Sequence, residues 1–101
     1  MQNFYKRCQK LRNFYLTMEA DNTKVIILSK IVAISFYNDK HLDDLPKGEI
    51  LDIYCYGLSC NIITIQNCLA SVLSDLQFNK FDIWHHDNYA LFPTVHFIIN
   101  D

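Results

Sequence analysis

Three histidines in the C-terminal third are the side chains of this chain best suited to acid–base or metal chemistry. His85 and His86 are adjacent and precede Asp87, and His96 follows in the next apolar run. An imidazole changes charge near neutral pH, and a nearby carboxylate can orient it. On a strand His85 and His86 point to opposite faces, so they cannot share a site, although His96 could pair with one of them. We interpret the histidines as partly exposed strand residues, with a metal-ligand set as the alternative.

The cysteines and the short motifs give no sign of a catalytic or metal centre. Cys8, Cys55, Cys60 and Cys68 form no CxxC pair and lack zinc-ligand spacing, so we expect free thiols. The chain contains no GxGxxG, Walker loop, GxSxG or HExxH motif. We expect no enzymatic activity, no catalytic residues, no metal and no cofactor.

Length and hydropathy indicate one small domain. The chain has 101 residues, of which 50% are hydrophobic and 20% charged, and its net charge is -2. No apolar run reaches the roughly 20 residues of a membrane span, and polar residues interrupt the N-terminus where a secretory signal would be apolar. We expect an intracellular protein, nuclear or cytoplasmic, without a membrane partner.

Positive charge is concentrated at the N-terminus. Lys6, Arg7, Lys10 and Arg12 precede the first acidic residue, whereas from residue 22 onward five lysines face nine acidic residues. Apolar residues in residues 1–21 recur at four- and three-residue steps, which predicts an amphipathic helix with one apolar stripe. The stripe consists of Phe4, Cys8, Leu11, Tyr15 and Met18. Such a helix lies on the domain or on a partner, and its basic face also allows a nucleic-acid or membrane-surface role.

Residues 22–101 predict an α+β or α/β domain in which helices alternate with strands. The continuous apolar run 24–29 is rich in β-branched residues and predicts a buried central strand. Helical spacing predicts a helix over residues 31–45, ended by Pro46-Lys47-Gly48. Residues 49–56 predict a second strand, and residues 59 or 61 to 76 a helix capped by Ser59 or Asn61. Strands 81–86 and 94–99 follow, joined by a hairpin loop over 87–93. We expect a four-stranded sheet with two helices on one face and the first two strands parallel.

Gly57 stands where the second strand passes into a helix, in a chain with only 2 glycines. Because glycine has no Cβ, it permits a sharp turn or the close approach of a phosphate. Two short motifs, Ser29-Lys30 after the first strand and Gly57-Leu58-Ser59-Cys60-Asn61, resemble the Alba superfamily of nucleic-acid-binding proteins. The resemblance covers residues 23–100 and is nearest to the small Alba-type subunits of ribonuclease P and MRP.

The resemblance implies a two-layer α+β sandwich of order β-α-β-α-β-β over residues 22–101, preceded by the helix in residues 1–21. It implies a non-catalytic RNA-binding protein, with DNA as the alternative target, acting as a homodimer, a heterodimer with another Alba-like subunit, or a ribonucleoprotein subunit. From the family motifs it selects Lys30, Gly57 and Asn61 as nucleic-acid-binding residues. By their charge we add other candidates: Lys24, Lys80, Lys6, Arg7, Lys10 and Arg12.

This sequence departs from the family pattern at two places, and both departures should weaken nucleic-acid binding by the chain alone. Ile62 follows the asparagine where many members have Lys or Arg, and the final hairpin lacks arginine. Either the basic N-terminal helix or a more basic partner subunit supplies the missing charge. The alternative function is a protein interaction module, in which the helix ending at residue 76 and the last strand form a dimer and the N-terminal stripe docks a partner. A small enzyme or ligand-binding domain of another family would need a polar pocket near the histidines.

Overall fold

The computed structural model describes residues 4–18, 22–37, 48, 50–55, 58, 60–86 and 93–101. The elements follow one another as two helices, a strand, a helix and two strands. They are α1 (Phe4–Thr17), α2 (Asn22–Tyr37), β1 (Ile50–Tyr54), α3 (Ile62–Asp75), β2 (Phe81–His86) and β3 (Thr94–Ile99). The chain is thus a small α+β domain, which confirms the general fold class.

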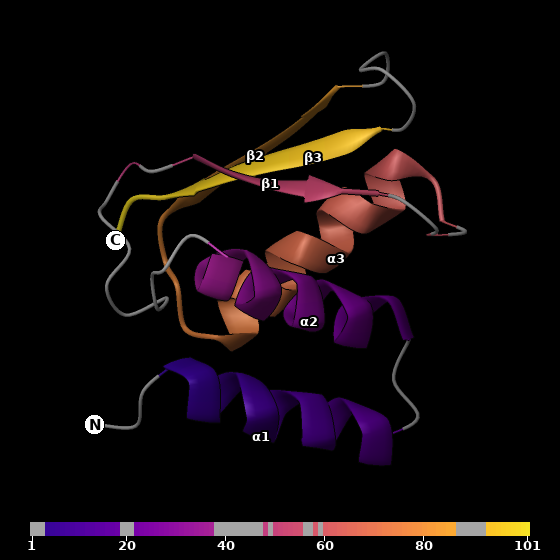
Figure 1. The fold of residues 1–101 in the computed structure, drawn as a ribbon, viewed down its shortest axis with the longest axis vertical. Helices are drawn as coiled ribbons and strands as arrows, with labels where there is room; N and C mark the ends of the chain where they lie inside the picture. The colour runs from indigo at the N-terminus through magenta and orange to yellow at the C-terminus, as the bar shows by residue number, and fades with distance from the viewer. Residues whose placement is uncertain are drawn as a thin grey trace.

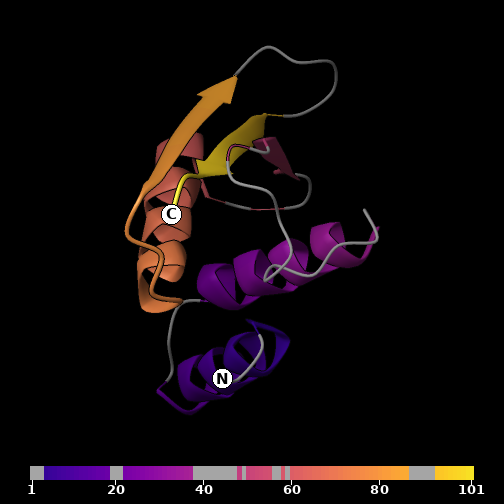
Figure 2. The ribbon, with the colours of Figure 1, turned by 90° about the vertical axis from the view of Figure 1, so that its left-hand side faces the viewer.

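The elements are stacked in layers. In Figure 1 the sheet lies at the top, α2 and α3 lie below it, and α1 lies at the bottom against α2. Figure 2 shows the same succession from the side, with the N-terminus beside α1 and the C-terminus beside the sheet and α3. The sheet and α1 are therefore at opposite ends of the domain.

The sheet is antiparallel and has the strand order β1-β3-β2. Because β1 and β2 each pair antiparallel with β3, they run parallel to each other on either side of it. The expected four-stranded sheet with adjacent parallel strands is wrong for the described residues, since the predicted first strand is absent from it. The predicted strands at 49–56, 81–86 and 94–99 are confirmed as β1, β2 and β3.

Alternation along the strands gives the sheet a covered face and an open face. Leu51, Ile53, Val95 and Phe97 are buried against the helices. Their neighbours along the chain point to the other side, where Ile50 and Tyr54 are exposed. Figure 1 shows helices on one side of the sheet only.

Residues 24–29 are helical, so the predicted central strand at 24–29 is wrong. Ile27, Leu28 and Ile31 in α2 are almost completely buried, and Val25 and Val32 are half-buried. α1 covers one side of α2, and α3 with the sheet covers another. The remaining exposed stripe also carries apolar residues, Ile26, Ala33 and Tyr37, so the sequence shows no clear helical period. Such a run cannot be distinguished from a buried strand by periodicity. Of the predicted helix 31–45, residues 31–37 belong to α2, and most of the remainder lies outside the described residues.

The N-terminal helix lies on the domain, one of the two arrangements expected from its stripe. Cys8 and Tyr15 belong to the buried core, Phe4 and Leu11 pack against it, and Met18 is exposed. Phe4 stacks on Phe78, with ring centroids 4.9 Å apart. The stripe therefore stabilises the monomer and is not left to dock a partner.

Helix α3 follows its prediction and begins at the second of the two candidate caps. The Asn61 Oδ1 accepts a hydrogen bond from the Thr64 backbone N–H at 2.8 Å. Four apolar residues of α3 are buried: Ile65, Leu69, Val72 and Leu73. This stripe packs inside the chain, and the dimer expected through α3 stays a prediction. Gly57 and residues 87–92 lie outside the described residues, so the predicted turn and hairpin loop are not described.

Candidate nucleic-acid interface

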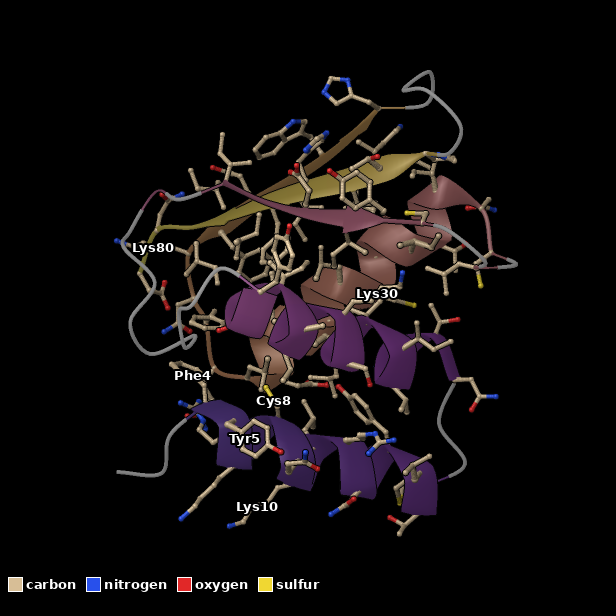
Figure 3. The ribbon with its side chains drawn as sticks, in the orientation of Figure 1. Phe4, Tyr5, Cys8, Lys10, Lys30 and Lys80 are labelled. Carbon is tan, nitrogen blue, oxygen red and sulfur yellow. The ribbon has the colours of Figure 1, made fainter. Side chains whose placement is uncertain are left out.

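Three of the four N-terminal cations are exposed on the outer surface of α1. Lys6, Lys10 and Arg12 are exposed, and no acidic residue occurs within α1. Figure 3 shows the Lys10 side chain directed away from the domain. A cationic surface is the electrostatic requirement for binding a phosphate backbone, and here Asp75 of α3 lies on one flank of that surface.

Arg7 contacts the end of α3 through its guanidinium group. Its Nη2 donates to the Leu76 carbonyl at 2.5 Å and to the Gln77 Oε1 at 3.1 Å. Its guanidinium also lies 4.5 Å from the centre of the Phe4 ring. The Leu76 carbonyl is at the C-terminal end of α3, where carbonyl groups need donors and a cation is favourable. Arg7 therefore fastens α1 to α3.

Each flank of α1 has a groove whose lining includes a cation and an exposed aromatic ring. Arg12 and Tyr5 line a groove of about 250 Å³ between α1 and α2. Lys10 and Phe14 line a groove of about 260 Å³ that also contains Asp75. Tyr5 is 43% exposed and Phe14 55% exposed. Unpaired bases stack on such rings while their phosphates contact nearby cations.

Neither Tyr5 nor Phe14 is among the site residues predicted from the sequence. The signal was present, because Tyr5 precedes Arg12 by seven residues and Lys10 precedes Phe14 by four. Residues at these separations share a face of a helix.

The two predicted lysines of α2 are both engaged with other parts of the chain. Lys24 Nζ donates to the Ser71 Oγ at 2.9 Å and lies 5.3 Å from the centre of the Tyr15 ring. Lys30 Nζ donates to the Tyr54 carbonyl at 2.9 Å, at the end of β1. Both side chains are half-buried. These contacts give Lys24 and Lys30 structural roles in joining layers.

The remaining predicted residues are distributed over the molecule. Asn61 is the α3 cap, Lys80 is exposed just before β2, and Gly57 lies outside the described residues. Figure 3 places Lys80 beside the sheet, Lys30 between α2 and β1, and Lys10 at the far end of the domain. The structure therefore brings together the α1 cations and does not gather all the predicted residues on one surface.

The histidines behave as strand alternation predicts. The His85 Nδ1 lies 2.8 Å from the Gln66 Oε1 of α3, and His86 lies on the open face. There its ring meets His96 edge to face, with centroids 4.7 Å apart. Trp84 stacks on the same His96 at 5.5 Å. Of the two histidines that could pair with His96, His86 is the one whose ring contacts it. All three are strand residues that are at least partly exposed, as interpreted from the sequence.

Asp52 is a partner of His96 that the sequence did not reveal. Its Oδ1 lies 2.6 Å from the His96 Nδ1, and the two residues are direct cross-strand neighbours. Only the β1–β3 register could have indicated this pair. Within the described ranges, no three His, Cys, Asp or Glu side chains are arranged to hold a metal ion.

Two pKa shifts reflect burial within the fold. Burial, together with the hydrogen bond that its hydroxyl donates to the Asp75 carboxylate, raises the pKa of Tyr15 far above its ordinary value of 10.0. Burial also raises the pKa of the Cys55 thiol. None of the four cysteines, all within described segments, forms a disulfide. A thiol with a raised pKa is a poor nucleophile, so Cys55 acts as a small core residue.

Comparisons with known proteins give no further assignment. No protein-family model, curated protein or solved structure matches the chain. Among the helices of the described segments, none is long and apolar enough to cross a membrane.

Proposed function

We propose that this protein is a non-catalytic RNA-binding protein that contacts RNA through the outer surface of α1. The observation that carries this proposal is the pairing of cations with exposed aromatic rings on both flanks of a helix that contains no acidic residue. Lys6, Lys10 and Arg12 contact phosphates, and Tyr5 and Phe14 stack on bases. Single-stranded segments fit best, because their bases are free to leave the stack.

The charge of the rest of the chain limits the strength of this binding. The body beyond residue 22 is acidic, and Arg7 and Lys24 are committed to contacts within the domain. Three phosphate contacts form a weak site on their own. A basic partner subunit, in a homodimer or a heterodimer, would strengthen it.

Membership of the Alba superfamily stays a prediction. The Ser29-Lys30 motif lies within α2, not after a strand, and the glycine motif is described only at Leu58, Cys60 and Asn61. A role in a ribonucleoprotein such as ribonuclease P or MRP follows from that resemblance alone. The RNA-binding proposal rests on the surface of α1 and does not require the Alba arrangement.

Two matched substitutions test the location of the binding surface. Lys10→Gln removes a cation from α1, and Lys80→Gln removes an equally exposed cation beside the sheet. With a labelled 12-nucleotide single-stranded RNA in about 0.1 M salt, loss of one phosphate contact lowers affinity about fivefold. We expect this loss for Lys10→Gln and little change for Lys80→Gln. Equal losses in fluorescence anisotropy titrations would place RNA elsewhere, and no binding by the wild type would refute the proposal.

A second pair of substitutions tests the aromatic contribution. Phe14→Ala removes an exposed ring beside Lys10, and Ile63→Ala removes a similarly exposed apolar side chain from α3. Stacking on one base contributes about 1–3 kcal/mol, so Phe14→Ala should weaken RNA binding at least fivefold. Ile63→Ala should leave binding unchanged. An unchanged affinity in Phe14→Ala would mean that the RNA contacts α1 only through its phosphates.

A further inference from the structure

A groove runs along β1 where this strand faces the second half of α2. Its volume is about 410 Å³, and its described lining comes from α2 and β1, with no residue of α1. Three of its lining residues are among the chain's exposed large hydrophobic side chains: Tyr37 at 90%, Ile50 at 56% and Tyr54 at 55%. Ala33, Ile34, Leu51 and Asp52 complete the lining.

The strand that forms one wall is an edge strand. Among the described residues β1 pairs only with β3. The Cys55 N–H donates to the Pro93 carbonyl, so the main-chain groups of residues 51, 53 and 55 point toward β3. Those of Ile50 and Asp52 point the other way, along the free edge. The Lys30 bond to the Tyr54 carbonyl marks the end of this edge.

A groove between an edge strand and a helix is the geometry in which an extended peptide adds as a further strand. Main-chain hydrogen bonds to Ile50 and Asp52 would hold such a peptide. Its side chains would alternate between the apolar wall formed by Ala33 and Ile34 and the open face of the sheet.

The negative charge in the groove indicates which charge a bound peptide should have. Among the described lining residues Asp52 alone is charged, and its side chain is 39% exposed. Its Oδ1 faces His96, and the carboxylate lies on the open face between Ile50 and Tyr54. A Lys or Arg opposite Asp52 would be favoured there, and its two neighbours would point toward α2 and should be apolar.

We propose that the groove between β1 and α2 binds an extended segment of a partner protein with the pattern apolar, basic, apolar, added as a strand to the free edge of β1. This site is independent of the RNA-binding surface on α1 and would let the protein bind RNA and a protein partner together.

A second copy of this chain is a poorer match for the groove. β1 carries Asp52 between Leu51 and Ile53, which is the pattern with the opposite charge. Pairing two β1 strands around Asp52 would place like charges opposite each other. No Lys or Arg in the sequence stands between two large apolar residues.

Synthetic peptides test the proposal with the full chain. The probe is a capped seven-residue peptide with a central lysine between two valines and polar residues outside them. The control peptide has glutamate at the centre. We expect the lysine peptide to bind three- to tenfold more tightly, because its lysine gains an exposed ion pair with Asp52, whereas the glutamate of the control peptide meets a like charge. In ¹⁵N NMR spectra of the protein, the peptide should change the chemical shifts of amides in β1 and in the second half of α2.

Backbone methylation separates strand addition from side-chain docking. Two versions of the lysine peptide carry N-methyl groups at alternate residues, so that one version loses the N–H groups that face β1 and the other loses those that face away. We expect one version to bind about tenfold more weakly than the other. Equal affinities of the two versions would overturn strand addition.

Protein variants complete the test. Ala33→Trp fills the groove from an exposed position of α2, and Asn67→Trp places the same side chain on an exposed position of α3. The first should abolish peptide binding and the second should not. Asp52→Asn should remove the preference for lysine over glutamate. Three results would each overturn the proposed partner. The wild type binds no peptide, the peptide shifts amide signals of residues outside β1 and α2, or sedimentation velocity shows a dimer that Ala33→Trp dissociates.

Discussion

The hydrogen bond between Tyr15 and Asp75 gives the protein a stability that depends on pH in a calculable way. The Tyr15 side chain is buried between α1 and the other helices, and its hydroxyl donates to the exposed Asp75 carboxylate. Hydrogen bonds to charged groups contribute about 1.5–3 kcal/mol. In Tyr15→Phe the carboxylate can turn to water, so the lower end applies. We expect Tyr15→Phe to lower the free energy of unfolding by about 1.5 kcal/mol at pH 8.

This difference should vanish in alkaline solution. In the unfolded chain Tyr15 ionises near its ordinary pKa of 10.0, whereas in the folded protein its pKa is raised. The unfolded state therefore loses this proton first, and the wild type loses up to about 1.36 kcal/mol per pH unit above 10 relative to Tyr15→Phe. The two stabilities should become equal at about pH 11.

Urea unfolding followed by circular dichroism at pH 8, 10 and 11 measures this change. Other tyrosines and lysines titrate in both proteins, so the difference isolates Tyr15. Tyr37→Phe, at a tyrosine that is 90% exposed, is the control and should match the wild type throughout. A difference between wild type and Tyr15→Phe that stays constant from pH 8 to 11 would refute the reasoning.

Three further local features can be tested by substitution and thermal unfolding. Asn61→Ala removes the α3 cap and should cost about 1 kcal/mol, whereas Asn61→Asp should retain most of the stability. Arg7→Gln breaks the contact with the end of α3 and should cost about 1.5 kcal/mol, whereas Arg12→Gln, on the exposed surface of the same helix, should change stability by less than about 0.5 kcal/mol. Gly48→Ala should cost about 1 kcal/mol from the backbone angle, since φ is +83° and, its chain neighbours aside, no atom of the described residues lies within 4 Å of the added Cβ. The cap argument is contradicted if Asn61→Ala leaves stability unchanged, and the backbone argument if Gly48→Ala does so. The argument for Arg7 is contradicted if Arg7→Gln and Arg12→Gln lose equal stability.

The elements that the sequence predicted well are those with one covered face. α1 and α3 each have an apolar stripe at helical spacing, and Asn61 supplies a cap whose chemistry is local. β2 and β3 are short runs with strand-forming residues, and the register places their alternation as expected. Local chemistry and periodicity suffice where one side of an element meets solvent.

The error at α2 has a physical origin. α1 packs on one side of α2 and the sheet with α3 on another, and the exposed positions 26 and 33 hold Ile and Ala. Apolar residues on both the covered and the exposed side remove the helical period, and β-branched residues such as Val25, Ile26 and Ile27 then favour a strand on local grounds. Only the tertiary arrangement selects the helix.

The sequence predicted which cations belong to the candidate site, but it did not predict which of them contact other parts of the chain. The α1 cations were visible as a cluster, but the commitment of Arg7 to Leu76 and of Lys24 to Ser71 depends on contacts between residues far apart in the sequence. The same holds for Asp52 and His96, whose pairing follows from the sheet register. The sequence shows how many cations there are, but it does not show which of them are engaged in contacts within the domain.

The salt dependence of RNA affinity tests the central proposal most directly. Three phosphate contacts from Lys6, Lys10 and Arg12 predict a slope of log affinity against log salt of about −2 for single-stranded RNA, or roughly a 20-fold loss between 50 and 200 mM salt. The variant in which all three are replaced by Gln should bind weakly with a slope near zero. If the triple variant keeps the wild-type slope, the outer surface of α1 is not the RNA-binding surface.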